Sequence, residues 1–299
     1  MPLFIEPHFH QPTSTATFLI WDTATLEAAV IDPVLDYEAR SSRLSTEAAD
    51  EVLRSVEDHG LTLRYVLETH AHADHLTAAR YLKSRTGARV VIGEKIADVQ
   101  AHFAPIFDAA DVVADGRVFD HLAKDGERLT FGELEILVMH TPGHTAACVS
   151  YLIDGAVFVG DTLFMPDYGT ARTDFPGGDA SVLYRSIRRI LDLPPETRVF
   201  VGHDYLPAAR TEFAWETTVA EQRRANIQIH DGVDEAAFIA QRRARDATLA
   251  APALLLPSLQ VNIRAGALPP PDATGHVFLR LPLTGIPEME DGRRMEAAK

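Results

Sequence analysis

The pattern of apolar and polar positions predicts strands that alternate with amphipathic helices over about the first 200 residues. Two strands are predicted around the polar turn DTATLE between residues 17 and 33, and two more at 63–67 and ARVVIGE. Helices are predicted from Ser45 or Thr46 to Gly60, and through LTAARYLKSRT to about Thr86, where apolar residues recur every three or four positions. Residues 96–124 show no clear period, so no element is predicted there.

From Glu127 onward the pattern becomes strongly β. RLTFGELEILVMH predicts one hairpin, and CVSYLI with AVFVG predicts another around the two-residue turn Asp154-Gly155. Asp179 can cap a helix, ASVLYRSIRRIL, and the strand RVFVG follows that helix. Further helices are predicted at about 212–225 and 234–250. The mixture predicts an α/β fold, with one large domain at 1–230 and an extension at 231–299 packed on it.

The extension changes character at Pro252. Proline and apolar residues dominate LLLPSLQVNIRAGALPPP, which favours an extended strap laid over the core. A contact in a homodimer is a further role open to this segment. From about Pro287 the residues are charged, and we expect them to be mobile.

Composition and charge narrow the classes of function. The net charge of -15 opposes a general affinity for nucleic acid or for an anionic membrane. The longest apolar stretches are short and broken by proline, so no membrane span is predicted. The single cysteine, Cys148, excludes an internal disulfide, and the start MPLFIEPHFH lacks the pattern of a secretory leader. These features predict a cytoplasmic protein.

Four residues of metal-ligand type lie in the stretch THAHADH, directly after the predicted strand at 63–67. Imidazole nitrogens and carboxylate oxygens are ligands that zinc and ferrous iron accept. Residues two apart in extended chain point to the same side, so His70 and His72 can converge on one ion. Asp74 and His75 fall at the start of the next helix and point elsewhere. The motif can therefore serve two adjoining sites, and its density argues against a merely solvated loop.

Three later β-rich runs also end in a residue of metal-ligand type. ILVMHTPGH brings His144, AVFVGD brings Asp161, and RVFVGH brings His203. We expect these strand ends to meet at one edge of the scaffold, where ligands are held rigidly and a substrate has access. Because the ligands are spread from His70 to His203, the site can form only when most of the chain has folded.

The ordered set THAHADH, TPGH, VGDT and VGHD resembles the metallo-β-lactamase superfamily over about residues 17–205. The resemblance implies an αββα sandwich with a metal site on one edge, here followed by a helical and extended C-terminal tail. Similarity to the hydroxyacylglutathione hydrolases implies hydrolysis of a glutathione thioester with two Zn(II) ions per chain. One ion would be held by His70, His72 and His144 and the other by Asp74, His75 and His203, with Asp161 as the bridge.

The loop GTARTDFPGGD at 169–179, followed by LYRSI and GHDY, resembles the persulfide dioxygenases more closely. That resemblance implies one Fe(II) per chain on a facial triad of His70, His144 and Asp161. The implied reaction takes glutathione persulfide and O2 to sulfite and glutathione. The remaining ligand-type residues would surround the triad and orient it: His72, Asp74, His75 and His203.

The chain departs from the persulfide dioxygenases in its long extension and in the sequence GTARTDF, where other members carry a cysteine-glycine-arginine version. With its long tail the chain resembles a bacterial subgroup of this family. We expect a non-heme iron dioxygenase. The alternatives are the dinuclear zinc thioester hydrolase and a non-catalytic sulfur-binding or sensory protein.

Arg172 and Tyr205 are the candidates for contacts with the substrate. The planar guanidinium of Arg172 can pair with a carboxylate of glutathione, although an internal pair with Asp174 or Asp179 is an equally open alternative. The hydroxyl of Tyr205 can donate to the substrate, or the ring can simply be a half-buried aromatic at a strand end. We expect Cys148 to be a buried small hydrophobe.

Overall fold

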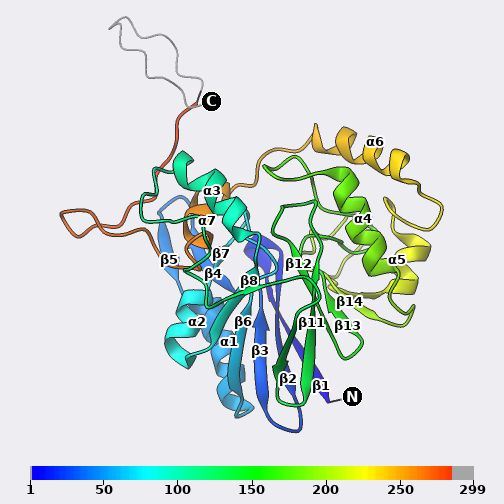
Figure 1. Cartoon of the computed structure of the whole chain (residues 1–299), viewed down its shortest axis with the longest axis horizontal. Coiled ribbons are helices and arrows are strands. Elements are labelled where there is room, and N and C mark those ends of the chain that lie inside the picture. The colour runs from blue at the N-terminus through cyan, green and yellow to red at the C-terminus, as the bar shows by residue number, and fades with distance from the viewer. Residues whose placement is uncertain (1, 285–299) are drawn as a thin grey trace, which may run out of the picture.

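Two six-stranded sheets pack face to face in the computed structural model of the chain, which describes residues 2–284 (Figure 1). The first sheet has the order β1-β2-β3-β6-β8-β9, and the second has the order β10-β11-β12-β13-β14-β15. Helices cover the outer face of each sheet, so the layers follow the expected αββα order. None of the helices in residues 2–284 is long and apolar enough to cross a membrane.

The first sheet is built from the N-terminal part of the chain. Its strands are β1 (Leu3–His10), β2 (Thr15–Asp22), β3 (Glu27–Ile31), β6 (Thr62–Leu67), β8 (Arg89–Gly93) and β9 (His121–Ala123). The last four run parallel to one another, so their carboxyl ends share one edge. A small separate sheet has the order β5-β4-β7 and consists of β4 (Val34–Glu38), β5 (Arg43–Ser45) and β7 (Leu76–Thr77).

The second sheet follows along the chain. Its strands are β10 (Arg128–Phe131), β11 (Leu134–His140), β12 (Val149–Ile153), β13 (Ala156–Phe158), β14 (Arg198–Phe200) and β15 (Glu216–Thr218). Neighbours pair antiparallel except for β13 and β14, which run parallel. The loops that leave β13 and β14 therefore start from the same edge of this sheet.

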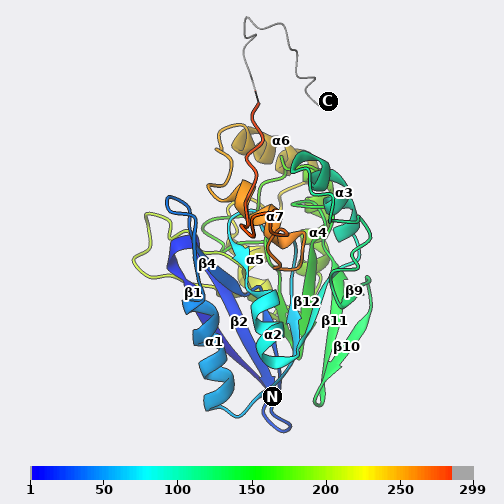
Figure 2. The ribbon, with the colours of Figure 1, turned by 90° about the vertical axis from the view of Figure 1, so that its left-hand side faces the viewer.

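Helices on the two outer faces complete the sandwich. In Figure 2, α1 (Glu47–Asp58) and α2 (Ala79–Thr86) lie in front of the first sheet, and α3 (Ile96–Ile106) and α7 (Leu255–Asn262) pack into the same apolar layer. The second sheet is covered by α4 (Ala180–Leu191), and the apolar layer between them also takes in residues of α5 (Val219–Ala225) and α6 (Glu235–Asp246).

Strand alternation explains the three apolar layers. Along β2, Leu19 and Trp21 face the layer beneath the helices, whereas Phe18 and Ile20 face the layer between the sheets. Successive strand residues point to opposite faces, so a strand buried on both faces is apolar throughout. The predicted ligands follow four of these strands, β6 in the first sheet and β11, β13 and β14 in the second.

Several local predictions are confirmed. The hairpin β12-β13 turns at Asp154 and Gly155, which both have positive φ, 45° and 78°, as a primed two-residue turn requires. The helix after the glycine-rich loop is α4, and the side chain of Asp179 accepts a 2.8 Å hydrogen bond from the backbone N–H of Val182. The strands around DTATLE are β2 and β3.

The predicted bounds of several helices were wrong, because contacts with distant residues outweigh the local sequence pattern there. The helix after THAHADH begins only at Ala79, because Leu76 and Thr77 pair with β4 as strand β7. The helix predicted at 212–225 begins at Val219, because Glu216–Thr218 pairs with β14 as β15. The helix predicted at 234–250 ends at Asp246. The predicted strap contains the helix α7, with Pro257 in its first turn, where proline is tolerated.

Three further outcomes concern the N-terminal strand, residues 96–124 and the charged end of the chain. Strand β1 was not predicted, and residues 96–124 contain α3 and β9. The expectation of mobility from Pro287 onward lies outside the described residues.

Candidate metal centre

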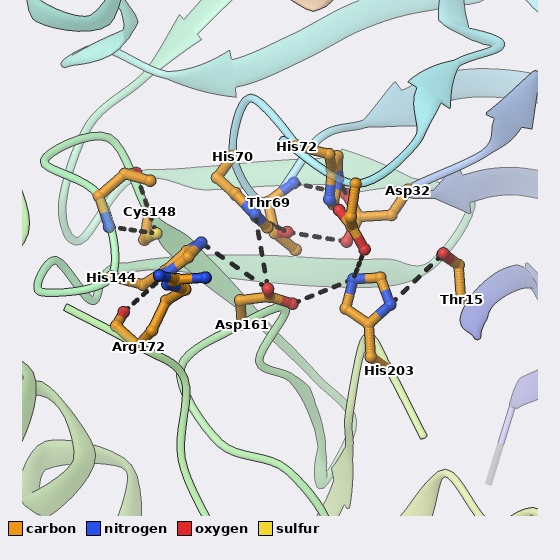
Figure 3. A network of polar contacts seen from close by, with 12 residues as sticks. Thr15, Asp32, Thr69, His70, His72, His144, Cys148, Asp161, Arg172 and His203 are labelled. Carbon is orange, nitrogen blue, oxygen red and sulfur yellow. Dashed lines mark hydrogen bonds and ion pairs between the residues drawn. The ribbon is translucent and has the colours of Figure 1, made fainter. Parts of the chain in front are cut away.

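All seven predicted ligand residues meet at one edge of the sandwich, as the strand-end pattern indicated. The stretch that begins at His70 follows β6, His144 follows β11, Asp161 follows β13 and His203 follows β14 (Figure 3). A bridge between Thr15 and His203, together with the hydrogen bond from Ala16 N–H to Gly202 O, joins the two sheets at this edge. Both sheets therefore contribute ligands to one cluster.

The cluster divides into two groups of donor atoms. His70, His144 and Asp161 form a group of three, whose ligand atoms all lie within 4.8 Å of one another. The Nε2 atoms of His70 and His144 lie 4.0 Å and 3.7 Å from Oδ2 of Asp161. A second group, under the same limit, consists of His72, Asp74, His75 and His203.

Asp161 lies between the two groups. Its Oδ2 faces the two histidines of the group of three, and its Oδ1 lies 3.2 Å from Nε2 of His203. The same Nε2 lies 3.2 Å from Oδ2 of Asp74. The two carboxylate oxygens of Asp161 thus point toward different groups, as Figure 3 shows for His70, His144 and His203.

The donor atoms of this cluster fit a metal. Among the described residues, a buried donor atom of each of six ligands has no hydrogen-bond partner: His70 Nε2, His72 Nδ1, Asp74 Oδ2, His75 Nε2, Asp161 Oδ1 and His203 Nε2. A buried polar atom without a partner costs roughly 1–3 kcal/mol. Several such atoms converging from imidazoles and carboxylates are what a divalent ion of the zinc or iron type would satisfy.

Hydrogen bonds behind the histidines orient them. Nδ1 of His144 lies 2.9 Å from the carbonyl oxygen of Arg172, and Nδ1 of His203 lies 3.2 Å from the carbonyl oxygen of Ser14. Each carbonyl accepts the Nδ1–H, so Nε2 carries the lone pair that a metal needs. Nδ1 of His70 lies 3.0 Å from the hydroxyl of Thr69.

Two buried carboxylates support His72 and were missed in the sequence. Its Nε2 lies 3.0 Å from Asp32 Oδ1 and 3.5 Å from Glu68 Oε2. Asp32 also accepts hydrogen bonds from the backbone N–H and the hydroxyl of Thr69, at 2.7 Å and 2.8 Å. Asp32 directly follows β3, so the strand-end pattern used for the other ligands could have found it.

Burial and charge set the protonation of the histidines. Burial lowers the pKa of His75 to about 4, and burial with the neighbouring imidazoles lowers the pKa of His70 well below its ordinary value. Burial alone would lower the pKa of His72 as well, but Asp32 and Glu68 outweigh it and raise that pKa well above the ordinary value. His70 and His75 are therefore ready as neutral ligands.

Close packing of a glycine places His144. Gly143 has φ +132°, and a Cβ added there would lie 2.3 Å from Cα of Leu183 in α4. The turn of TPGH therefore rests directly on the helix backbone, which only glycine permits. This contact fixes the chain immediately before the ligand.

A cavity of about 380 Å³ opens beside the ligand cluster. His144, Asp161 and Asp74 form its inner end, and aromatic side chains and residues of the 169–179 loop form its sides. The C-terminal extension closes it with Arg242, Arg245, Leu249, Ala250, Pro252, Ala253 and Leu254. The sequence predicted that the extension packs on the core, but it did not indicate which residues of the extension line the cavity.

Both predicted substrate residues line this cavity. Arg172 is paired internally with Asp174 at 2.6 Å and 2.7 Å, and it also donates to the carbonyl oxygen of Ala250 at 2.6 Å. This geometry matches the internal-pair alternative. The ring of Tyr205 stacks on His203 with centroids 5.7 Å apart, and the residue is 41% exposed.

Cys148 is buried near His144, as expected for a small hydrophobe. The residue is 2% exposed, and its sulfur lies 3.1 Å from the hydroxyl of Thr145. Burial raises the pKa of the thiol to about 12. A thiol with such a pKa is a poor nucleophile near neutral pH.

Comparison with known proteins agrees with this geometry. Residues 10–203 match the family model of the metallo-beta-lactamase superfamily. A probable metallo-hydrolase of Burkholderia pseudomallei is 50% identical over 94% of this chain and 99% of its own length. A glyoxylase B2 of Dictyostelium discoideum is 47% identical over 91% of this chain and 94% of its own.

Relatives of lower identity carry a different name. The human mitochondrial persulfide dioxygenase ETHE1 is 30% identical over 68% of this chain and 69% of its own length. The crystal structure of ETHE1 from Myxococcus xanthus is similar with a TM-score of 0.70 and 34% identity, and the match covers 88% of this chain and all of that one.

Proposed function

We propose that this chain, which belongs to the metallo-beta-lactamase superfamily, is a persulfide dioxygenase with one Fe(II) on His70, His144 and Asp161. The reaction takes glutathione persulfide, O2 and water to glutathione and sulfite, so the outer sulfur is oxidised and O2 is reduced. The observation that carries the proposal is that these three ligands form a group of their own beside a cavity walled by the loop 169–179.

Two histidines and one carboxylate are the ligand set of non-heme Fe(II) oxygenases, which leave coordination positions open. When bound, ferrous iron would supply the redox chemistry and open positions for the sulfur and for O2. The residues supply the rest. His144 donates its Nδ1–H to the carbonyl of Arg172, which ties the ligand to the loop that lines the cavity.

The comparisons support this reaction in part. A relative named persulfide dioxygenase and the structure named ETHE1 both match this chain over most of its length. The more similar relatives are named metallo-hydrolase and glyoxylase, so the proposal depends on the ligand grouping and on the cavity loop rather than on identity alone.

Aromatic side chains make the inner part of the cavity suitable for a sulfur group. Phe175 packs edge-on against His144 with ring centroids 5.4 Å apart. Phe164 packs against both His203 and Tyr205. These rings limit the access of water to the reacting end of a substrate, while the hydroxyl of Tyr205 is available to donate a hydrogen bond.

The anionic part of glutathione requires a cation at the outer part of the cavity. Arg172 has its charge compensated by Asp174, and Arg242 forms a buried pair with Asp246. Arg245 lines the same cavity, is exposed, and forms no ion pair among residues 2–284. Arg245 is therefore the cation we assign first to a substrate carboxylate, with Arg172 and Tyr205 as further contacts.

A dinuclear zinc thioester hydrolase is the second candidate, and one observation favours it. The oxygens of Asp161 point to both ligand groups, as a bridging carboxylate would. The second group contains Asp74, His75 and His203, the ligands implied for the second ion, but it also contains His72, which the resemblance to the hydrolases assigns to the first ion. A non-catalytic sulfur-binding protein would use the same ligands without turnover.

Metal analysis combined with two activity assays separates the three candidates. The protein is purified without added metal, analysed for iron and zinc, and then loaded anaerobically with Fe(II). We expect one iron per chain and O2 uptake when glutathione persulfide is added. Two zinc ions per chain with cleavage of a glutathione thioester and no O2 uptake would support the hydrolase. Metal binding without either activity would support the binding protein.

A further inference from the structure

The C-terminal extension reaches the back of the ligand loop, residues 70–75, through the side chain of Asn262. Asn262, the last residue of α7, is 3% exposed. Its Nδ2 donates hydrogen bonds to the carbonyl oxygens of His72 and His75, both at 2.8 Å. Its Oδ1 accepts a hydrogen bond from the backbone N–H of Thr77 at 2.9 Å. One amide thus meets three backbone groups in and just after the ligand loop.

These hydrogen bonds act on a segment that lacks the regular backbone hydrogen bonds of a helix or strand. The backbone of His72 and His75 lies between β6 and β7, outside any helix or strand. Buried backbone groups in such a segment need partners, and Asn262 supplies them. The amide of Asn262 donates two hydrogen bonds and accepts one. A shorter side chain, or one that can only donate or only accept, cannot make all three bonds.

Asn262 is itself held in place by independent contacts. Nε2 of Gln100 in α3 donates to the carbonyl of Ile263 at 2.9 Å, and Arg264 forms an ion pair with Asp111 at 2.7 Å. Gly266 lies so close to α2 that an added Cβ would be 2.9 Å from the backbone nitrogen of Arg80. The end of α7 is therefore fixed to the core on several sides, and in Figure 1 α7 lies beside β7.

We propose that Asn262 is a positioning residue of the metal centre, which holds the backbone of the ligand loop so that His72, Asp74 and His75 present their donor atoms. By this proposal the extension is a structural requirement for metal binding. The proposal rests on the metal site of the proposed function, but not on which reaction that site performs. Because His70 lies two residues before His72, the effect extends to the group of three.

The test compares Asn262→Ala with Gln100→Ala. Both changes remove a buried amide that joins the end of α7 to the core, but only Asn262 contacts the ligand loop. The probe is Co(II), added to metal-free protein, with affinity measured against a chelator and geometry followed by visible absorption. For Asn262→Ala we expect affinity to fall about 10- to 100-fold and the absorption band to change. For Gln100→Ala we expect a lower melting temperature with both metal readouts as in the wild type, because the contacts of Arg264 and Gly266 still hold the end of α7.

A second variant covers the case in which Asn262→Ala does not fold. Asn262→Asp keeps an acceptor for Thr77 N–H but cannot donate to either carbonyl, so its Co(II) affinity should also fall at least tenfold. Wild-type affinity and spectrum in a folded Asn262 variant would overturn the proposal. An equal loss of affinity in Gln100→Ala would overturn it too, because the effect would then be general instability. Neither readout requires turnover, so an absence of O2 uptake by the wild type would refute only the proposed reaction.

Discussion

Nδ1 of His144 lies 2.9 Å from the backbone carbonyl oxygen of Arg172, so the proposed metal ligand and the loop at the cavity wall are joined by one hydrogen bond. This bond directs Nε2 of His144 toward Asp161 and couples the position of the ligand to the conformation of residues 169–179. The metal side and the substrate side of the site are therefore parts of one hydrogen-bonded unit.

Substitutions in the two ligand groups should have different effects on metal content. His144→Ala removes a member of the proposed triad, so bound iron and O2 uptake should both fall to background. His203→Ala should keep about one iron per chain and lose about 10- to 100-fold in activity, because His203 contacts Asp161 from outside the triad. Metal analysis and oxygen-electrode rates check this. A change from two ions to one in His203→Ala would instead indicate a dinuclear site.

Arg245→Gln should raise KM for glutathione persulfide about 10- to 100-fold, because a charge-assisted hydrogen bond contributes roughly 1.5–3 kcal/mol. The kcat should stay near the wild-type value. Arg243→Gln is the matched control, since Arg243 is exposed on the same helix but does not line the cavity. Steady-state kinetics at low and high salt measure the effect. Equal KM values for the two variants would remove Arg245 from substrate binding.

The buried pair of Arg242 and Asp246 should control the stability of the cavity wall. Asp246 also accepts hydrogen bonds from the backbone N–H and the hydroxyl of Thr173, both at 3.0 Å. Asp246→Asn leaves the guanidinium buried without its partner charge, so the free energy of unfolding should fall by about 3–5 kcal/mol. Urea unfolding measures this. The double variant Arg242→Met with Asp246→Leu should recover part of the lost free energy of unfolding. If it recovers none, the loss does not come from the unpaired charge of Arg242.

The ion pair between Asp111 and Arg264 should give an acid-sensitive contribution to stability. The hydrogen bond from Arg264 lowers the pKa of Asp111 below its ordinary value of 3.8. A carboxyl whose pKa is depressed on folding stabilises the protein above its unfolded pKa and loses this effect as pH falls through the folded pKa. Asp111→Asn should therefore be less stable than the wild type at pH 7, and the two should converge in acid below 3.8. Urea unfolding at both pH values tests this, and a difference that persists in acid would contradict it.

Cys148 should be dispensable for the reaction. Its thiol is buried and its pKa is raised to about 12, so little thiolate forms near neutral pH. Native protein should resist iodoacetamide, with labelling only after unfolding, and Cys148→Ala should retain activity near the wild-type rate, because a buried neutral thiol is a poor nucleophile. Mass spectrometry of the labelled protein and oxygen uptake provide the two measurements. Loss of turnover in a folded Cys148→Ala variant would assign the thiol a chemical role.

Short stretches of the sequence were sufficient to predict the local features of this protein. The seven ligand-type residues, the strands that deliver them, the turn at Asp154-Gly155 and the cap at Asp179 depend on short stretches whose periodicity and residue types carry the information. The superfamily motifs are also short stretches of sequence, so they could be recognised without any knowledge of how the chain packs.

The partners of these residues, in contrast, depend on how the whole chain folds. Asn262 is 190 residues from His72, and Ala250 is 78 residues from Arg172. The sequence pattern around each residue therefore does not predict either contact. The strand pairing of Leu76–Thr77 and Glu216–Thr218 likewise depends on neighbours distant in the chain, which is why helices were predicted to begin too early there. Long-range packing brings together groups whose proximity depends on the register of whole elements, and only the folded chain specifies that register.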